Sequence, residues 1–433
     1  MMKTFSHSRF AVYFLIGFSF LILISCTPGG ESEQAGGKPN VVLIFLDDGA
    51  FDDFQPFGQT RYPTPHVSTL AEEGCSFYSF YVPQAICSAS RAALMTGCYP
   101  GRTKVFGAHG PRQPGLDPQF ATMGEMMKQN GYATACFGKW HLGDQEGRWP
   151  FDRGFDESCG LMYSNDMWKH HPENPDYWSQ WPLQYWENDE ITIDSVTQED
   201  QKMLTTWYTE HAVDFINRHK DEPFFLYVPH SMPHVPIFCS DKFLGKSGTG
   251  LYGDVMMEID WSVGQIRQAI NDNGLEANTL FIFIGSDNGP WLSYGDHAGV
   301  TPYREGKGTI FDGGVRNPVV IKYPGHIESG TTSLNTFCSI DLLPTLCAVT
   351  GAKLPANEID GRNVWDLILN KPGAGNPHAY YPLTTGNAFQ GVISGDGKWK
   401  LHLPHVYRSL ESSGKDGMPG KYRHPEIDTA LFD

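Results

Sequence analysis

The sequence has little positive charge. Its 32 lysines and arginines stand against 49 aspartates and glutamates, which gives a formal net charge of −17. Proteins bind nucleic acids through clustered basic side chains, so this balance argues against nucleic acid as a partner. The chain also lacks internal repeats, low-complexity blocks and heptads, so it shows no sign of a solenoid or a coiled coil.

A regular cysteine pattern is missing as well. The chain has nine cysteines. When Cys26 and Cys87 are set aside, an odd number remains, and their spacing matches neither a disulfide framework nor a zinc site. We expect most of these to be buried small hydrophobic residues.

The apolar run near the N-terminus, residues 10–24, is too short and too close to the chain start for a membrane span. Lys3 and Arg9 precede it, as in an export signal. We therefore predict a lipoprotein signal peptide over residues 1–25. We predict that residues 26–38, which are rich in Gly, Ser and Glu, form a flexible tether.

The end of this signal, Leu-Ile-Ser-Cys at residues 23–26, resembles a bacterial lipobox. The resemblance implies cleavage before Cys26 and lipidation of its thiol, so that a lipid anchor is the sole contact with the membrane. It implies an exported protein of the bacterial periplasm or cell surface. Plain secretion, with Cys26 incidental, is the alternative.

Buried parallel strands are predicted where continuous apolar runs rich in β-branched residues occur. These runs cover residues 40–46, 132–137, 224–228 and 279–285, and a further strand is predicted over 318–323. Helical patterns cover residues 64–74, 87–97, 120–130, 201–219, 252–273 and 339–349, the last with an interruption near Pro344. The alternation predicts an α/β fold with a large, mostly parallel sheet sandwiched by helices over residues 39–350.

The amino-acid composition changes from about Gly351, where Pro, Gly and Asn become common. Short strands are predicted near Val392 and over 399–403. We predict a small C-terminal α+β subdomain over residues 351–433.

Carboxylate and amide side chains follow two of the predicted strands. Asp47 and Asp48 come directly after residues 40–46, and Asp287 and Asn288 follow the strand 279–285. Ligands bind at the carboxyl ends of strands in open α/β sheets, and adjacent acids repel unless a cation holds them. This set of oxygen donors fits one Ca²⁺ better than zinc, with Mg²⁺ as the alternative ion. A solvated acid pair in a loop is the other interpretation of Asp47 and Asp48.

The predicted helix at residues 87–97 begins with a thiol. Ser88 and Ser90 suit an N-cap or a first turn, and Arg91 adds a fixed positive charge. A helix N-terminus favours an anion, so Cys87 is a candidate nucleophile aimed at an anionic ligand. On chemistry alone, a buried cysteine on an ordinary helix is an equal alternative.

Cys87 to Arg91, read as Cys-x-Ala-x-Arg and followed by Leu-Met-Thr-Gly, resembles the signature of the formylglycine-dependent sulfatases, in the alkaline phosphatase superfamily. Members often have Pro where this chain has Ala89, and Ala is an accepted variant. Other segments match in family order. They are Gly-Lys-Trp-His-Leu-Gly at 138–143, Pro-His-x-Pro around His234, Asp-Asn-Gly at 287–289 and the Gly-rich stretch 304–318.

The resemblance implies a role for each matching residue. Cys87, oxidised to formylglycine and hydrated, is the nucleophile and a metal ligand beside Asp47, Asp48, Asp287 and Asn288. Arg91 steadies it, while Lys139, His234 and Lys307 offset charge on the transferred group. Either His234 or Lys307 protonates the leaving oxygen, and His141 takes the proton that expels sulfate. His230 is a lower-ranked alternative to His234.

Residues 151–191 are rich in aromatic, His and Pro residues and show little periodicity, so we predict an irregular insertion over the active-site face. Candidate substrate contacts are Asn165, Asp166, Trp168, His170 and His171 in this segment, with His297, His402 and His405 further along the chain. Packed loop residues are the alternative for each of them.

The resemblance implies an alkaline phosphatase-like fold and an arylsulfatase-type sulfuric ester hydrolase whose substrate is a sulfated carbohydrate or a similar ester. It also implies a formylglycine-generating maturation enzyme as a partner. Family members usually continue past the point where this chain stops, which implies a truncated subdomain. Two alternatives remain, a phosphate mono- or diester hydrolase of the same superfamily and a non-catalytic lipoprotein that binds sulfated glycans.

Overall fold

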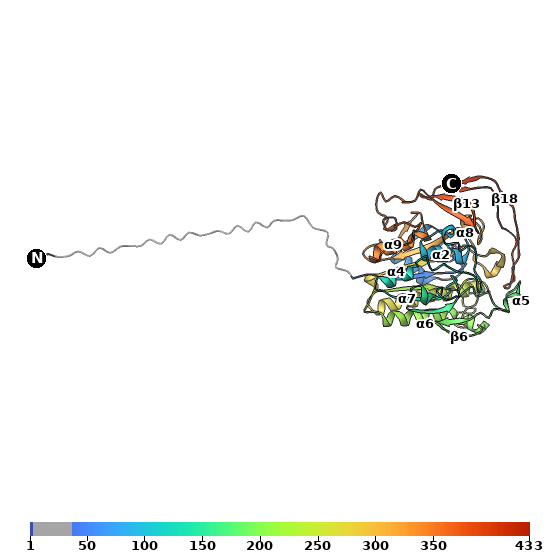
Figure 1. Cartoon of the computed structure of the whole chain (residues 1–433), viewed down its shortest axis with the longest axis horizontal. Helices are drawn as coiled ribbons and strands as arrows, with labels where there is room; N and C mark the ends of the chain where they lie inside the picture. The colour runs from blue at the N-terminus through green and yellow to red at the C-terminus, as the bar shows by residue number, and fades with distance from the viewer. Residues whose placement is uncertain (3–36) are drawn as a thin grey trace. The chain divides into compact units, whose positions relative to one another are not determined.

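The computed structural model describes residues 1–2 and 37–433 (Figure 1). The predicted signal peptide, Cys26 and most of the predicted tether lie outside the described residues. Residues 37–433 form one compact unit. None of the helices within the described ranges combines the length and the apolar character that crossing a membrane requires.

A large mixed sheet organises this unit. Its order is β10-β2-β9-β8-β1-β7-β3-β4-β5-β6, with β11 beside β2. The strands are β1 (Asn40–Phe45), β2 (Cys75–Tyr81), β3 (Ala133–Phe137), β4 (Glu157–Leu161), β5 (Tyr185–Glu187), β6 (Glu190–Ile193), β7 (Phe224–Pro229), β8 (Thr279–Ile284), β9 (Arg316–Lys322), β10 (Thr331–Ser333) and β11 (Phe337–Cys338). The five central strands β8, β1, β7, β3 and β4 are parallel, whereas β9 runs antiparallel to β8 and β2.

Strand β1 lies at the centre of the sheet and is apolar except for Asn40, whose Oδ1 atom accepts a hydrogen bond from Phe224 N–H at 3.3 Å. All six are buried, and the strand pairs with β7 on one side and with β8 on the other. Val42 lies opposite Leu226 and Phe281 in this register. A strand covered on both faces needs a continuous apolar run, which is the pattern seen in the sequence.

Helices cover the sheet. They are α1 (Pro65–Glu73), α2 (Cys87–Thr96), α3 (Pro100–Thr103), α4 (Met123–Gln129), α5 (Pro175–Trp178), α6 (Gln198–Arg218), α7 (Leu251–Asp272), α8 (Asp312–Val315), α9 (Leu342–Thr350) and α10 (Trp365–Ile368). Helices α1, α6 and α7 form one contacting group, and α2, α4 and α9 form another. Figure 1 shows α6 toward the bottom and α9 toward the top of the unit. The predicted α/β sandwich is confirmed.

A smaller antiparallel sheet follows toward the C-terminus. It consists of β12 (Tyr380–Thr385), β13 (Ala388–Ser394), β14 (Lys400–His402) and β19 (Ala430–Phe432). Two short pairs accompany it, β15 (His405–Val406) with β18 (Glu426–Ile427) and β16 (Ser409–Ser412) with β17 (Lys421–Arg423). Thr384 N–H donates to Pro83 O at 3.1 Å, so this sheet is joined to the segment that leads into Cys87.

Several boundaries differ from the sequence prediction. The segment 151–191 is not irregular throughout, because β4 joins the central sheet beside β3, and β5 and β6 extend the sheet. Strand β2 was not predicted. Pro344 does not interrupt α9; it lies in the first turn, where a helix does not need the missing N–H. Helix α4 starts at Met123 because Thr122 and Glu125 form a capping box.

Candidate active site

Polar side chains from distant parts of the chain meet at the carboxyl ends of the central strands. Asp47 and Asp48 follow β1, Lys139 follows β3, His234 follows β7 and Asp287 follows β8. All five are buried. The candidate ligand atoms of Asp47, Asp48, His234 and the nearby Cys87 lie within 4.8 Å of one another.

Backbone geometry at two strand ends brings these groups together. Gly138 has φ +145°, and a Cβ atom at this position would lie 2.0 Å from Pro229 O. Only glycine allows β3 and β7 to converge so closely before Lys139. Asp48 and His141 both have φ +61°, a left-handed conformation that costs non-glycine residues about 1 kcal/mol. Such local strain is common where the surrounding structure holds a functional side chain in place.

Cys87 is the first residue of α2. Its Sγ atom lies 3.2 Å from Asp47 Oδ1 and 3.4 Å from Lys307 Nζ. Ser88 and Ser90 lie in the first turn and do not cap the helix. The N-cap residue is Ile86, and Ser88 Oγ accepts a hydrogen bond from His109 N–H at 2.9 Å. Burial, together with the carboxylates of Asp287 and Asp47, raises the pKa of the Cys87 thiol well above its usual range.

Three buried cations balance three buried carboxylates. Lys139 Nζ pairs with Asp47, Lys307 Nζ donates to Asp48 Oδ1 at 2.7 Å, and Arg91 Nε donates to Asp287 Oδ2 at 2.9 Å. Arg91 Nη1 also donates to the main-chain oxygen of Lys139 at 2.9 Å. Helix α2 therefore fixes the strand ends that carry Asp287 and Lys139.

The carboxylates of Asp47 and Asp287 respond oppositely to this environment. Burial raises the pKa of Asp47, but Lys139, His234 and Arg91 outweigh that effect and hold it well below its usual range. Burial and the charge of Asp47 raise the pKa of Asp287 to about 7, against the opposing effect of Arg91. Asp287 is thus the member of the set with the greatest need for a further positive charge.

The two histidines have different partners. His141 Nε2 lies 2.8 Å from His109 O, so it carries the proton, and the buried Nδ1 has no partner among the described residues. Burial, Lys139 and Arg91 hold the pKa of His141 well below its usual range, so the ring is neutral. His234 Nδ1 lies 2.6 Å from Val235 O, which leaves Nε2 facing Asp48 Oδ2 at 3.5 Å.

The donor set fits a hard divalent cation. Asp47, Asp48, Asp287 and Asn288 offer oxygen atoms, the ligands that calcium and magnesium prefer. Asn288 Nδ2 donates to Asp48 Oδ1 at 2.7 Å, while its Oδ1 atom is buried without a partner among the described residues. A buried oxygen without a donor is costly, and a bound cation would satisfy it.

A cavity of about 420 Å³ opens above this cluster, and we call it the active-site cavity. Its lining includes Cys87, His234 and Lys307 together with the aromatic side chains Tyr177, Trp178 and Trp291. Lys307 Nζ lies 4.5 Å from the centre of the Trp291 ring. The cavity therefore joins a polar, charged end at Cys87 to an aromatic rim.

The predicted substrate contacts occupy different places. Asp166 and His171 line the active-site cavity, as does Trp178 on α5. Asn165 is buried behind it, where Nδ2 donates to Gln201 Oε1 at 3.0 Å and to Pro236 O at 2.9 Å. Trp168, His170, His297, His402 and His405 are not among the lining residues found in the described part of the chain.

Three lining residues had no signal in the sequence analysis. Ser164 Oγ accepts from Lys139 Nζ at 2.6 Å and lies 3.3 Å from His234 Nε2, so it links the two. Trp291 packs edge-on against His234 with ring centres 5.7 Å apart. Arg408 reaches the cavity from the C-terminal region. None of these lies in a recognisable motif, and only the folded chain brings them to Cys87.

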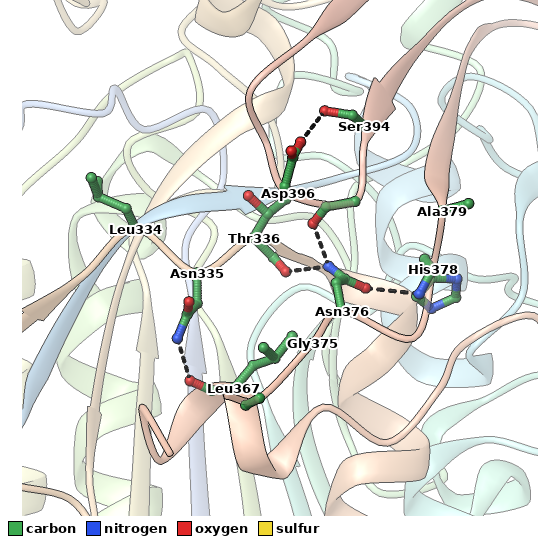
Figure 2. Close-up of a pocket in the computed structure, with 12 residues that line it drawn as sticks. Leu334, Asn335, Thr336, Leu367, Gly375, Asn376, His378, Ala379, Ser394 and Asp396 are labelled. Carbon is green, nitrogen blue, oxygen red and sulfur yellow. Dashed lines mark hydrogen bonds between the residues drawn. The ribbon is translucent and has the colours of Figure 1, made fainter. Parts of the chain in front are cut away.

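A second cavity, of about 460 Å³, shares no lining residue with the first (Figure 2). Asn376 Nδ2 donates there to Thr336 O and Gly395 O, both at 2.7 Å, and its Oδ1 accepts from His378 N–H at 2.9 Å. His378 Nε2 lies 2.7 Å from Asp341 Oδ1. Because these polar groups are already bonded to one another, we assign no chemistry to this cavity.

Comparisons with known proteins agree with this geometry. The family model described as Sulfatase matches residues 39–352. N-acetylgalactosamine-6-sulfatase of Mus musculus is 34% identical, covering 93% of this chain and 79% of that protein. Arylsulfatase A of Homo sapiens is 35% identical, covering 84% and 75%. The PsFucS1 sulfatase from Pseudoalteromonas sp. superposes with a TM-score of 0.81 at 27% identity, covering 91% of this chain and 83% of that one.

Proposed function

The chain belongs to the sulfatase family and is a sulfuric ester hydrolase, and we propose that it acts through formylglycine made from Cys87 with the help of one calcium ion. The proposed calcium ligands are Asp47, Asp48, residue 87, Asp287 and Asn288. The proposed substrate is a sulfated carbohydrate or a similar ester. The proposal is supported by the buried oxygen donors of Asp47, Asp48, Asp287 and Asn288, which lie beside a cysteine at a helix N-terminus.

The position of Cys87 is the observation that carries the proposal. A cysteine acts as a nucleophile through its thiolate. Burial and the neighbouring carboxylates raise the pKa of Cys87, so the unmodified side chain stays a thiol. The encoded cysteine is therefore a poor nucleophile, although it lies at the charged end of the active-site cavity. Conversion to formylglycine would explain why such a residue occupies this position.

The two added groups supply distinct chemistry. A calcium ion would polarise the oxygens of the bound sulfate group. Formylglycine, as its hydrate, would offer one hydroxyl to attack sulfur and a second whose proton is lost when sulfate departs. Arg91 would hold this residue in place through its hydrogen bonds to Asp287 and to the main chain of Lys139.

The protein's own side chains would move the protons and balance charge. His141 is neutral and its free Nδ1 atom would accept the proton of the second hydroxyl. Lys139, His234 and Lys307 would offset negative charge on the sulfuryl oxygens. Of these three, His234 and Lys307 line the active-site cavity, where the leaving group would lie, which supports one of these two as the acid that would protonate the leaving oxygen.

A carbohydrate substrate agrees with the aromatic rim. Trp178 lines the active-site cavity and stacks on His171 with a ring-centre distance of 5.8 Å; a Cβ atom at Gly110, another lining residue, would lie 3.4 Å from its ring. Aromatic faces bind the apolar faces of sugar rings. One relative, N-acetylgalactosamine-6-sulfatase, is named for a sulfated amino sugar.

The test is sulfate release from 4-nitrophenyl sulfate by protein co-expressed with a formylglycine-generating enzyme. We expect turnover that disappears in Cys87→Ala, with aldehyde at position 87 confirmed by peptide mass spectrometry. A matched assay with 4-nitrophenyl phosphate runs beside it. Faster hydrolysis of the phosphate, or near-normal activity in Cys87→Ala, would overturn the proposal.

We also propose that the protein is exported and anchored through a lipid on Cys26. The proposal rests on the sequence of residues 23–26 alone. Expression with a clickable fatty-acid analogue should label the wild-type protein and not Cys26→Ser, which should appear in the soluble fraction. Equal labelling of the two proteins would contradict the anchor.

A further inference from the structure

Arg408 brings a positive charge to the active-site cavity, and no carboxylate of the described residues forms an ion pair with it. Arg91 and Arg153, which are buried, and the half-buried Arg316 each pair with a carboxylate, at 2.9, 3.2 and 3.1 Å. Arg408 has no such partner within the described residues. Its Nη2 atom is buried and receives no hydrogen-bond acceptor from them either.

We propose that the guanidinium of Arg408 binds a second anionic group, a sulfate or a carboxylate, on the same molecule whose sulfate ester lies at Cys87. This inference rests on the proposed function, because it extends the same active-site cavity. It makes the preferred substrate a dianion, such as a disulfated sugar or a sulfated unit beside a uronic acid.

The guanidinium is held rigidly next to the catalytic cluster. Arg408 Nε donates to the main-chain oxygen of Lys307 at 2.5 Å. The ring of Tyr422 lies 5.0 Å from the guanidinium carbon. On another side is Gly308 with φ +82°, where a Cβ would lie 2.7 Å from the guanidinium, so glycine is needed to admit Arg408. Rigid placement lowers the entropic cost of binding an anion.

Lys307 connects the two positions. Its main-chain oxygen fixes Arg408, and its Nζ atom reaches Asp48 and Cys87. The Lys307 residue therefore lies between Arg408 and Cys87, where the sulfuryl group would be transferred. The two groups face the same cavity, so a small molecule can contact both at once.

The other charges on the cavity wall do not satisfy Arg408. Asp166 lines the cavity, but its Oδ2 atom faces His171 Nε2 at 3.8 Å rather than Arg408. Asp166 Oδ1 is buried without a described partner and suits a sugar hydroxyl. Lys307 is already paired with Asp48. An arginine left without a carboxylate in a chain of net charge −17 favours an anion supplied by the ligand.

The experiment compares dianionic and monoanionic substrates of the mature, calcium-loaded enzyme. The carboxylate arm sets 2-carboxy- and 3-carboxy-4-nitrophenyl sulfate against 4-nitrophenyl sulfate. The sulfate arm sets N-acetylgalactosamine 4,6-disulfate against N-acetylgalactosamine 6-sulfate. The readout in each arm is the ratio of kcat/KM for the dianion to that for the monoanion, measured in wild type and in Arg408→Gln.

We expect Arg408→Gln to lower this ratio about 10- to 100-fold in at least one arm, the range of a charged hydrogen bond. Arg408→Lys should keep part of the preference because it keeps the charge. If the substitution merely displaced Lys307, both substrates would slow together and the ratio would stay constant. Arg362→Gln is the control. It removes the same charge from a side chain that is exposed and lies outside the active-site cavity.

Two results would overturn the inference. One is a wild-type enzyme that turns over monoanions but prefers no dianion in either arm. The other is a preference that survives in Arg408→Gln. Failure of the proposed function would look different, because the aldehyde-bearing enzyme would then release no sulfate from any of the substrates.

Discussion

Replacing Arg91 with methionine should destabilise the protein strongly, because it would leave a buried carboxylate without its cation. Arg91 is fully buried, and so are Asp287 and Asp47. Methionine fills similar apolar volume beside Phe45, whose ring centre lies 5.5 Å from the guanidinium carbon. The substitution therefore removes the charge and its hydrogen bonds with little change in packing.

The expected cost is about 3–5 kcal/mol, the range for breaking a buried ion pair by deleting one partner. Asp47 keeps Lys139 in the variant, so Asp287 carries most of the penalty. The main-chain oxygen of Lys139 also loses its donor. Added calcium should narrow the difference from wild type, because a cation held by Asp47 and Asp287 would replace part of the lost charge.

Arg218→Met is the matched control. Arg218 also contacts two carboxylates, Glu157 at 2.6 Å and Asp214 at 2.7 Å, but its side chain is 45% exposed. Water screens such a pair, so the expected cost is at most about 1 kcal/mol. Urea unfolding followed by tryptophan fluorescence measures both variants. A loss for Arg91→Met no larger than for Arg218→Met would refute the reasoning from burial.

Removing the metal, the base or one buried acid should give three distinct results. Chelation should stop 4-nitrophenyl sulfate hydrolysis and calcium should restore it; recovery with zinc alone would contradict the oxygen-donor assignment. His141→Ala should slow sulfate departure more than ester cleavage, so mass spectrometry should detect one added sulfuryl group on the residue 87 peptide, and an unmodified peptide during turnover would exclude this role. Burial raises the pKa of Asp53 to about 7, so between about pH 4 and pH 7 the native state keeps a proton that the unfolded chain loses. The free energy of unfolding should therefore fall by about 1.4 kcal/mol for each pH unit in this range. Asp53→Asn should flatten that part of the urea-derived profile, and an unchanged slope would show that Asp53 is not its source.

The sequence predicts the central strands and the charged residues after them for a simple reason. A strand buried on both faces is a continuous apolar run, and polar residues that interrupt such a run mark its end. Asp47 after β1 and Asp287 after β8 are visible in this way. Lys139 and His234 also follow predicted strands, and matching short segments to a known family then singles them out among the residues of those loops.

The features that could not be predicted from the sequence depend on contacts between residues far apart in the chain. Strand β4 contains Gly160 and only five residues, so its pairing with β3, rather than its composition, makes it a strand. Arg408 lies 101 residues after Lys307, and no motif surrounds it. Its position depends on the missing Cβ at Gly308 and on the ring of Tyr422, which lies alongside its guanidinium. Packing of this kind has no periodicity to detect.

The charge balance of the site gives a reason for a divalent cation that is independent of family membership. Its ion pairs join Asp47 with Lys139, Asp48 with Lys307 and Asp287 with Arg91. With these six groups ionised the set is neutral, whereas a sulfate ester carries one negative charge and free sulfate carries two. A cation on the carboxylates would bring the set to +2 and would release both lysines toward the sulfuryl oxygens. Arg91 would stay in place, since its bond to a main-chain oxygen does not depend on the carboxylates. The two lysines that pair with buried carboxylates in this structure would thus become contacts for substrate if a metal were bound.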